Sequence, residues 1–306
     1  MTPLTDTIKV KVEYAKKNGD EAALKAFNIS SETLSRYKRL VKHLPSKPNY
    51  PQILIFDIET MPLEVYVWGL YLQRINHDNI IKDWYVATWS AKWLFDEEIK
   101  SDGLTSEEAI AGDDSRVCKS IWSLFESADI VIAHNAKRFD IRRLNARWML
   151  NGLKPPSPYM VIDTLTESRK MAAHASHRLD YLGKLMLNKG KIETNFKLWK
   201  DCKVGDQDAL AEMEIYNRED VSLLEELYLE IRPWMKSHPN TGLFVDGDTA
   251  VCPTCGHDKL IPIDPYFTSV GMYPGYRCAE CGSISRGRFT EVALKKRKNL
   301  IVGTAR

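Results

Sequence analysis

Residues 53–60 read ILIFDIET, a short apolar run that ends in acids and is the clearest indication of the fold. Its four consecutive large apolar side chains predict a strand that is buried within a sheet. Asp57 and Glu59 are two residues apart, so their side chains leave a strand on the same face. They fall at the carboxyl end of the run, where α/β sheets commonly place their functional sites. Alone, the pair is weak evidence, because the chain holds 41 acidic residues.

The segments that follow predict an α/β domain with a mixed sheet covered by helices. Strands come first along the chain and helices are interleaved afterwards, which is typical of such a layered fold. The strands over 65–70 and 86–95 are expected to be hairpin neighbours of the first strand. The other predicted elements are a helix around 116–126, a strand over 129–134, and helices around 140–151 and 207–236.

A second acidic position follows the predicted strand over 129–134. The segment IVIAHNAKRFDIRRL (130–144) runs from an apolar strand through a polar turn into a helix that carries Asp140. Asp140 is expected at the start of this helix, where the helix dipole favours a negative charge. An aspartate that only caps the helix is the alternative interpretation.

A third acidic position lies in IYNREDVSLLEELY (215–228). Tyr216 and Asp220 are four residues apart and share one face of a helix. The same face continues as an apolar stripe through Leu223, Leu224 and Leu227, which must face the core. Asp220 is therefore expected at the edge of the buried face.

The three segments bring four carboxylates towards one place: Asp57, Glu59, Asp140 and Asp220. Like charges so close together are costly to keep ionised unless cations neutralise them. Oxygen ligands favour Mg²⁺ or Mn²⁺. Two such ions about 4 Å apart can activate a water and stabilise the leaving oxygen of a phosphodiester.

At this point the sequence resembles a known family. FDIET, HNAKRFD and YNRED resemble, in that order, the three exonuclease motifs of the DEDD superfamily, which includes the proofreading domains of DNA polymerases. The resemblance covers about residues 50–235. Tyr216 marks the tyrosine subtype, because the histidine subtype would carry a histidine at position 215, which is isoleucine. The resemblance implies a ribonuclease H-like mixed sheet with flanking helices.

The same resemblance implies an activity and roles for the acids. The protein would be a 3′→5′ exonuclease that releases nucleoside 5′-monophosphates by a two-metal mechanism. Asp57, Glu59 and Asp220 would hold one Mg²⁺ or Mn²⁺, and Asp57 and Asp140 would hold the other. Tyr216 would orient the attacking water.

The resemblance also implies residues that contact or support the substrate. Thr60 and Met61 would border the 3′-terminal nucleotide. Asn135 and Phe139 would support the segment around Asp140 in the substrate-binding part of the site.

Four of the six cysteines form a second motif. CPTC (252–255) and CAEC (278–281) are separated by 22 residues, and this spacing is typical of a tetrahedral Zn²⁺ site that resembles a zinc ribbon. Gly256 and Gly282 allow a tight turn after each pair. Redox-active pairs are the competing interpretation. One structural Zn²⁺ is expected on Cys252, Cys255, Cys278 and Cys281.

The residues before the central region predict a small helical module. LPSKPNYP (44–51) holds three prolines and is expected to be a linker. Before it, one helix is expected over about 6–18, a second capped by Asp20, and a third capped by Ser30 or Ser31. The last two resemble a helix-turn-helix, and a docking or oligomerisation module is the alternative. The cations expected to contact nucleic acid are Arg36, Lys38, Arg39 and Lys42.

Charge is unevenly distributed along the chain. Residues 1–48 hold ten Lys and Arg against five Asp and Glu, and residues 245–306 hold nine against six. The centre is therefore acidic, which suits an enzyme that binds cations between parts that contact polyanions. No apolar run approaches the roughly 20 residues of a membrane span, and no signal peptide is evident. A cytoplasmic protein without a membrane partner is expected.

Together these observations predict three parts: a helical module over 1–48, a nuclease domain over 49–240, and a zinc ribbon with a basic tail over 245–306. DNA is the expected substrate, with single-stranded 3′ ends favoured. An exoribonuclease and a non-catalytic nucleic-acid-binding regulator are the alternatives. By analogy, a small phage-like accessory nuclease that acts in trans with a replication or recombination protein fits this composition.

Overall fold

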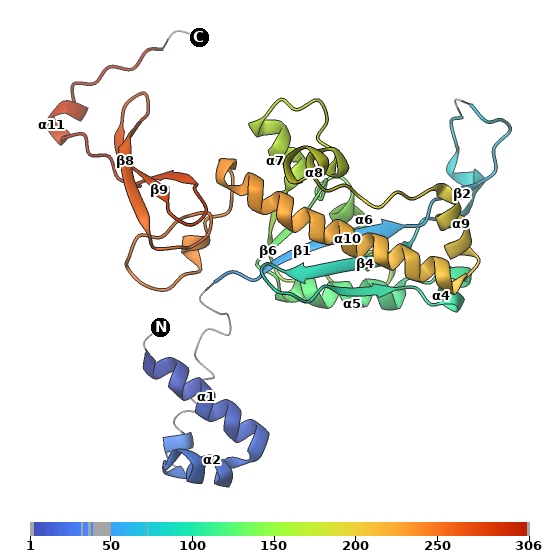
Figure 1. Cartoon of the computed structure of the whole chain (residues 1–306), viewed down its shortest axis with the longest axis horizontal. Helices are drawn as coiled ribbons and strands as arrows, with labels where there is room; N and C mark the ends of the chain where they lie inside the picture. The colour runs from blue at the N-terminus through green and yellow to red at the C-terminus, as the bar shows by residue number, and fades with distance from the viewer. Residues whose placement is uncertain (1–2, 32, 36–37, 39–49, 72, 305–306) are drawn as a thin grey trace.

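The strand predicted from ILIFDIET is the centre of a five-stranded sheet. The computed structural model (Figure 1) describes residues 3–31, 33–35, 38, 50–71 and 73–304. In it the sheet order is β5-β4-β1-β6-β7, with β4 and β5 antiparallel to their neighbours and β1, β6 and β7 parallel. The mixed sheet is thus confirmed. Its strands are β1 (Ile53–Thr60), β4 (Val86–Trp93), β5 (Lys100–Gly103), β6 (Ile130–Ala133) and β7 (Met160–Asp163).

Strand β1 is buried because both faces of the sheet are covered. Ile53, Leu54, Ile55 and Phe56 are almost inaccessible to solvent, as the run of apolar residues predicts. In the register with β4, Asp57 lies opposite Ser90 and Glu59 opposite Thr88. The polar end of β1 therefore meets a polar stretch of its neighbour.

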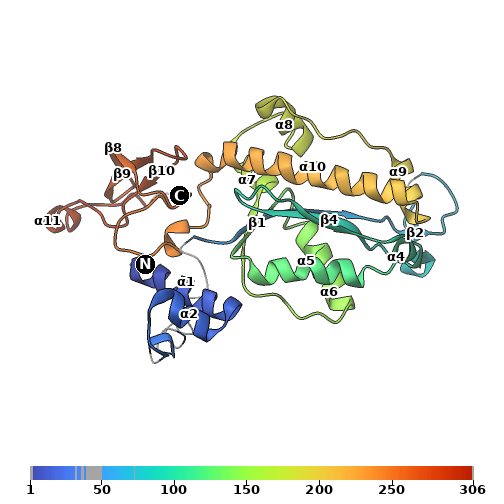
Figure 2. The same cartoon turned by 60° about the horizontal axis from the view of Figure 1, so that its bottom comes forward.

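Helices cover the two faces of the sheet. The longest helix, α10, runs along one face and contacts β1, β4 and β5, while α5 and α6 lie against the other face (Figure 2). Buried apolar side chains on α10 repeat at helical spacing, which is why this helix lies flat on the sheet. The helices of the domain are α4 (Ser106–Ala111), α5 (Ser115–Ser127), α6 (Asp140–Leu150), α7 (Thr164–Met171), α8 (Leu179–Leu187), α9 (Phe196–Lys203) and α10 (Gln207–Ile231).

Two sequence predictions in this domain are wrong. Residues 65–70 do not form a sheet neighbour of β1. Instead β2 (Glu64–Val65) pairs only with β3 (Ile80–Lys82), next to the short 3-10 helix η1 (His77–Asn79). The long helix ends at Ile231 rather than near residue 236, because Pro233 cannot donate a helical hydrogen bond. The chain continues as a 3-10 turn, η2 (Arg232–Trp234).

The N-terminal residues are helical and have their own small apolar cluster, formed by Ala15, Ala23 and Leu34. Helix α1 (Pro3–Asn18) starts earlier than predicted, and α2 spans Asp20–Phe27. The predicted cap is wrong, because Gly19 occupies the cap position of α2 and no side chain caps this end.

The third predicted helix is described only in part. Ser30 caps it, since its hydroxyl accepts a hydrogen bond from the backbone N–H of Thr33. Lys38 pairs with Asp20 at 2.6 Å. The other expected contacts to nucleic acid, Arg36, Arg39 and Lys42, lie outside the described residues, as does most of the predicted linker.

The C-terminal residues form a separate antiparallel sheet with the order β10-β9-β8. It follows a 3-10 turn, and the described chain ends with a short helix. These elements are η3 (Thr241–Leu243), β8 (Leu260–Phe267), β9 (Met272–Cys278), β10 (Ile284–Arg286) and α11 (Leu294–Arg297).

The described helices of the chain are too short or too polar to span a membrane.

Candidate active site

Three of the four predicted carboxylates meet at the carboxyl end of β1. Oxygen atoms of Asp57, Glu59 and Asp220 all lie within 4.8 Å of one another. Strand β1 supplies the first two from one face, and α10, which lies on that face, supplies the third. This close set does not include Asp140. Asp140 is the first residue of α6 and is only 2% exposed.

Helix α10 holds the cluster from the buried side. Asn217 is fully buried on α10, and its Nδ2 donates a hydrogen bond of 2.7 Å to Oδ2 of Asp57. Asp220 follows on the same buried face one turn later. The amide therefore fixes the orientation of the Asp57 carboxylate relative to the helix that carries Asp220.

The turn between β6 and α6 places Asp140. Asn135 has a φ of +78°, a left-handed conformation that asparagine tolerates better than most residues. The carboxylate of Asp163, at the end of β7, accepts hydrogen bonds from the backbone N–H groups of Asn135 and Lys137 at 3.1 and 3.2 Å. Phe139 precedes the helix, where the Arg143 guanidinium lies 4.6 Å from the centre of its ring. Asp163 thus fixes the turn that leads into α6.

The charge state of the cluster reflects its crowding. Burial raises the pKa of Asp57 far above its usual value, and the nearby Asp140, Asp220 and Glu59 carboxylates raise it further. Burial also raises the pKa of Glu59 and the pKa of Asp140, each to about 7. The protein alone therefore does not stabilise full ionisation of these acids.

A lysine partly offsets this repulsion. Lys191 lies in the loop after α8, and its Nζ forms an ion pair with Oδ2 of Asp220. The same Nζ donates a hydrogen bond of 3.2 Å to the hydroxyl of Tyr216. The backbone N–H of Lys191 donates to Oδ1 of Asp180 at 3.0 Å, which holds the loop against α8. One ammonium group faces several carboxylates, so it offsets only part of their mutual repulsion.

The donor set fits divalent cations. Oδ2 of Asp140 and Oδ1 of Asp220 are buried and meet no hydrogen-bond donor among the residues that the structure describes. Buried carboxylate oxygens without partners are costly unless a cation or water binds them. An all-oxygen set favours Mg²⁺ or Mn²⁺. Asp57, Glu59 and Asp220 are the residues placed to share one ion.

The residues expected to border the substrate lie directly after these acids. Thr60 ends β1, and Met61 follows it with its backbone N–H donating to the carbonyl of Tyr85 at 2.8 Å. Met61 lines a cavity of about 210 Å³ together with aromatic side chains of α9 and two lysines. The other lining residues are Pro62, Leu63, Glu64, Tyr85, Phe196, Trp199, Lys200 and Lys203.

Comparison with protein families agrees with this geometry. Residues 54–232 match the model of the RNase H superfamily, a range that contains all four acids and most of the chain. The chain belongs to the RNase H superfamily. This superfamily commonly includes metal-dependent nucleases, so the domain indicates nuclease activity with a nucleic acid as substrate. A search of curated proteins finds no match.

Two residues of this RNase H-like site were not predicted from the sequence. Asn217 sits three residues before Asp220, on the buried stripe, so a polar residue at a core position was a usable signal. Lys191 lies in the polar segment NKGKIET (188–194), where nothing in the local pattern separates it from Lys189. The proximity of Lys191 to the carboxylates becomes evident only in the folded chain, where the loop lies beside α10.

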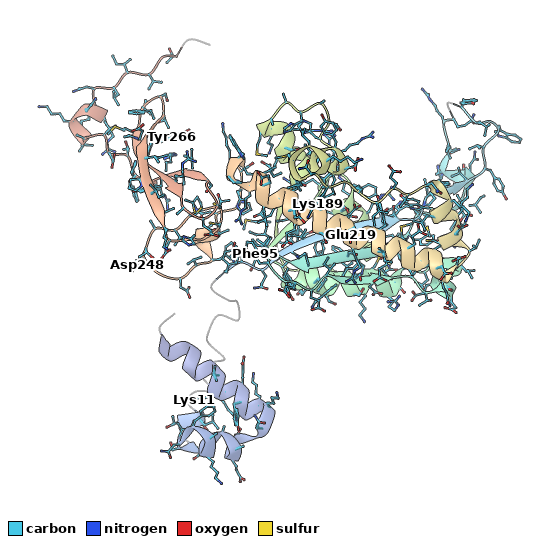
Figure 3. All side chains as sticks on the ribbon, in the orientation of Figure 1. Lys11, Phe95, Lys189, Glu219, Asp248 and Tyr266 are labelled. Carbon is cyan, nitrogen blue, oxygen red and sulfur yellow. The ribbon has the colours of Figure 1, made fainter. Side chains whose placement is uncertain are left out.

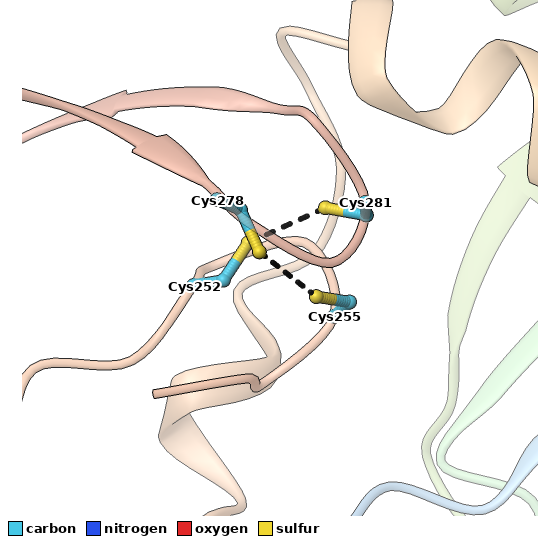
Figure 4. Close-up of side chains that lie close together, drawn as sticks. All are labelled: Cys252, Cys255, Cys278 and Cys281. Carbon is cyan, nitrogen blue, oxygen red and sulfur yellow. Dashed lines mark hydrogen bonds between the residues drawn. The ribbon is translucent and has the colours of Figure 1, made fainter. Parts of the chain in front are cut away.

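The four cysteines of the C-terminal part also converge (Figure 4). Their sulfur atoms all lie within 4.8 Å of one another, with 3.6 Å between Cys252 and Cys281 and 3.5 Å between Cys255 and Cys278. Gly256 and Gly282 have φ angles of +73° and +76°, and each donates its N–H to the first cysteine carbonyl of its pair. The two pairs thus make equivalent tight turns, which fit a tetrahedral Zn²⁺ site.

We predict that one Zn²⁺ per chain copurifies with the protein. Replacing Cys255 with serine removes one of four ligands, so the zinc content is expected to fall and the 252–286 region to become protease-sensitive. Metal analysis and limited proteolysis measure both effects. Cys202→Ser, at a buried cysteine outside the cluster, is the matched control and should keep its zinc. A full zinc content in the Cys255→Ser variant would contradict the assignment.

Proposed function

We propose that this protein is a metal-dependent 3′→5′ exonuclease of the DEDD tyrosine subtype. The observation that carries the proposal is the group formed by Asp57, Glu59 and Asp220, with Asp140 buried nearby and Tyr216 one turn before Asp220. These are the acids and the tyrosine of the three exonuclease motifs, in their order along the chain.

In this proposal Asp57, Glu59 and Asp220 would hold one divalent ion, and Asp57 and Asp140 would hold a second. When bound, such ions supply an activated water and neutralise charge on the phosphate. Asn217 keeps the Asp57 carboxylate oriented, and Tyr216 aligns the attacking water with its hydroxyl. The water oxygen forms a new bond to phosphorus, and the bond from phosphorus to the 3′ oxygen of the preceding nucleotide breaks. The products are a nucleoside 5′-monophosphate and a strand shortened by one nucleotide with a free 3′ hydroxyl.

The experiment that tests this proposal determines direction and product. Single-stranded oligonucleotides labelled at either end are incubated with Mg²⁺, and the products are separated by chromatography. Release of 5′-monophosphates from the 3′ end supports the proposal. Internal cleavage, release from the 5′ end, or no hydrolysis with either Mg²⁺ or Mn²⁺ would overturn it.

DNA is the proposed substrate, and RNA is the alternative. The preference rests on the N-terminal helices, which resemble a helix-turn-helix, and on the polymerase-like tyrosine subtype. Matched DNA and RNA oligonucleotides in the same assay decide between them. The division into a helical module, a nuclease domain and a zinc ribbon is likewise part of this proposal, as is action in trans with another protein.

Tyr216→Phe is predicted to slow cleavage by about 10- to 1000-fold, the scale of losing one positioned polar group at a catalytic centre. The ring and its packing are retained, and only the hydroxyl is lost. Burial raises the pKa of Tyr216, and the Asp220 carboxylate raises it further, so the phenol remains protonated and serves to orient water. Single-turnover rates measure the effect.

A matched control separates this role from general packing. Tyr181→Phe removes a hydroxyl from a partly exposed tyrosine on α8 and should leave the rate unchanged. Oligonucleotide affinity should be the same for both variants and wild type. A wild-type rate for Tyr216→Phe would leave Tyr216 as a packing residue and remove the mechanistic basis of the subtype.

A further inference from the structure

The segment that connects β2 to β3 carries an unusual number of exposed apolar side chains. We call the described residues 65–71 and 73–77 the arm. Trp68 is fully exposed, and Tyr66, Leu70 and Tyr71 are 73%, 89% and 84% exposed. Figure 3 shows side chains standing off this cyan loop, away from the body of the domain. Grouped exposed aromatic residues on a protein surface usually mark a binding site.

The base of the arm is held in place on both sides. Glu64 in β2 forms an ion pair with Lys203 at the end of α9. Lys82 in β3 donates from Nζ to the carbonyl of Ile110 at 3.0 Å. The backbone N–H of Tyr66 donates to the carbonyl of Asn79 at 2.9 Å, which closes the loop. The aromatic side chains are thus presented from a fixed base.

The charge of the arm favours a polyanion as its binding partner over a positively charged partner. Residues 65–77 contain Arg74 and no aspartate or glutamate, although the central part of the chain is acidic overall. Lys200 lines the cavity at the foot of the arm, beside the Lys203–Glu64 ion pair, whose two charges cancel. Exposed aromatic side chains without acids between them, with Arg74 among them and Lys200 at their foot, are the combination that binds single-stranded nucleic acid through stacking and phosphate contacts.

The arm is also continuous with the candidate active site. It begins only six residues after Glu59, and the chain between them passes through Met61, Pro62 and Leu63, which line that same cavity. A strand bound at the carboxylates would therefore have the cavity and then the arm as its neighbouring surfaces.

We propose that the arm binds the unpaired bases of the substrate strand by stacking on Trp68, Tyr71 and Tyr66. This proposal rests on the proposed function, because it places the bound strand at the same carboxylates. In this proposal the arm binds bases that are no longer paired in a duplex. Substrates with single-stranded ends are therefore bound more tightly than substrates with paired ends.

The test measures binding of a fluorescent 16-nucleotide oligo(dT) to the full chain in EDTA, where no cleavage occurs. Trp68→Ala and Tyr71→Ala are each expected to weaken binding by about 5- to 100-fold, the range for losing one stacked base. Trp68→Phe should keep most of the affinity, whereas Trp68→Leu should lose as much as Trp68→Ala, because only an aromatic ring stacks. Trp234→Ala is the matched control, since Trp234 is 74% exposed on η2 and should not alter binding.

Three outcomes would overturn the proposal. If Trp68→Ala binds the oligonucleotide with wild-type affinity, nucleic acid is not the ligand of the arm. Full affinity in Trp68→Leu would indicate apolar docking of a protein instead of stacking. A wild-type dimer that becomes a monomer in Trp68→Ala, measured by light scattering, would make a second copy of the chain the occupant. Binding is measured without cleavage, so these results are independent of the assay with end-labelled oligonucleotides. A negative result in that assay would overturn the proposed exonuclease activity but not the proposed role of the arm.

Discussion

Asp57→Asn is expected to abolish nucleic-acid hydrolysis, with a loss of at least about 1000-fold, the scale of removing a central catalytic group. The pKa of Asp57 is raised by all three of the other acids, and asparagine removes its charge while preserving its shape. The amide oxygen can still accept the hydrogen bond from Asn217, so the geometry of the helix is retained. The loss should therefore come from the missing charge and not from a displaced α10.

The same substitution is expected to stabilise the metal-free protein. The folded-state pKa values of Glu59 and Asp140 are raised to about 7, so the native state binds more protons than the unfolded chain between about pH 4 and 7. Its stability in EDTA should then fall as pH rises through that window. Removing the Asp57 charge lessens the repulsion, so the Tm of Asp57→Asn should exceed the wild-type Tm at pH 8.

Single-turnover rates and thermal melting in EDTA check both parts. Asp208→Asn, at an exposed acid in the first turn of α10, is the matched control and should keep the wild-type rate and Tm. Wild-type turnover in a purified Asp57→Asn preparation would show that the reaction takes place elsewhere.

Asp114→Asn is expected to destabilise the domain by about 3–5 kcal/mol, the cost of breaking a buried ion pair. Asp114 is fully buried and accepts hydrogen bonds from Nε and Nη2 of Arg147 at 2.6 and 2.7 Å. Val86 and Asn151 donate to it as well. Burial alone would raise the pKa of Asp114, but these hydrogen bonds outweigh it and lower the pKa. The variant leaves the guanidinium of Arg147 without its counter-ion.

Urea denaturation at pH 7 measures this effect. Glu226→Gln is the matched control, because the Lys189–Glu226 pair is well exposed and its loss should cost less than about 1 kcal/mol. The double variant Asp114→Asn with Arg147→Met should recover part of the lost stability, since it no longer buries an unpaired charge. Equal costs for Asp114→Asn and Glu226→Gln would contradict this account.

Local pattern was enough to predict the elements that carry the site. The strand at 53–60 has both the apolar run and the paired acids, and α10 has a stripe long enough to show helical spacing. Short connecting helices such as α7 and α9 have too few turns for a periodic signal. Residues 65–70 were misassigned because the β-branched and aromatic residues of VYVWGL favour a strand whether they are buried or, as here, mostly exposed.

The candidate site could be predicted only where its residues stand on regular elements. Asp57, Glu59 and Asp220 have spacings that fix their faces, so their meeting follows once the helix lies on the sheet. Lys191 has no such spacing, and its approach to Asp220 depends on how the loop after α8 returns across α10.

The order of the acids along the chain has a consequence for biosynthesis. Asp57 lies on the first strand of the domain and Asp220 on its last helix, so the cluster closes only after 163 further residues have been made. At about 5–20 residues per second, synthesis of this stretch takes roughly 10–30 s. A nascent chain on the ribosome therefore displays β1 well before it can assemble the carboxylates. While the chain is still being synthesised next to its own mRNA, its nuclease centre is therefore incomplete. The centre can form only after the whole domain has emerged from the ribosome.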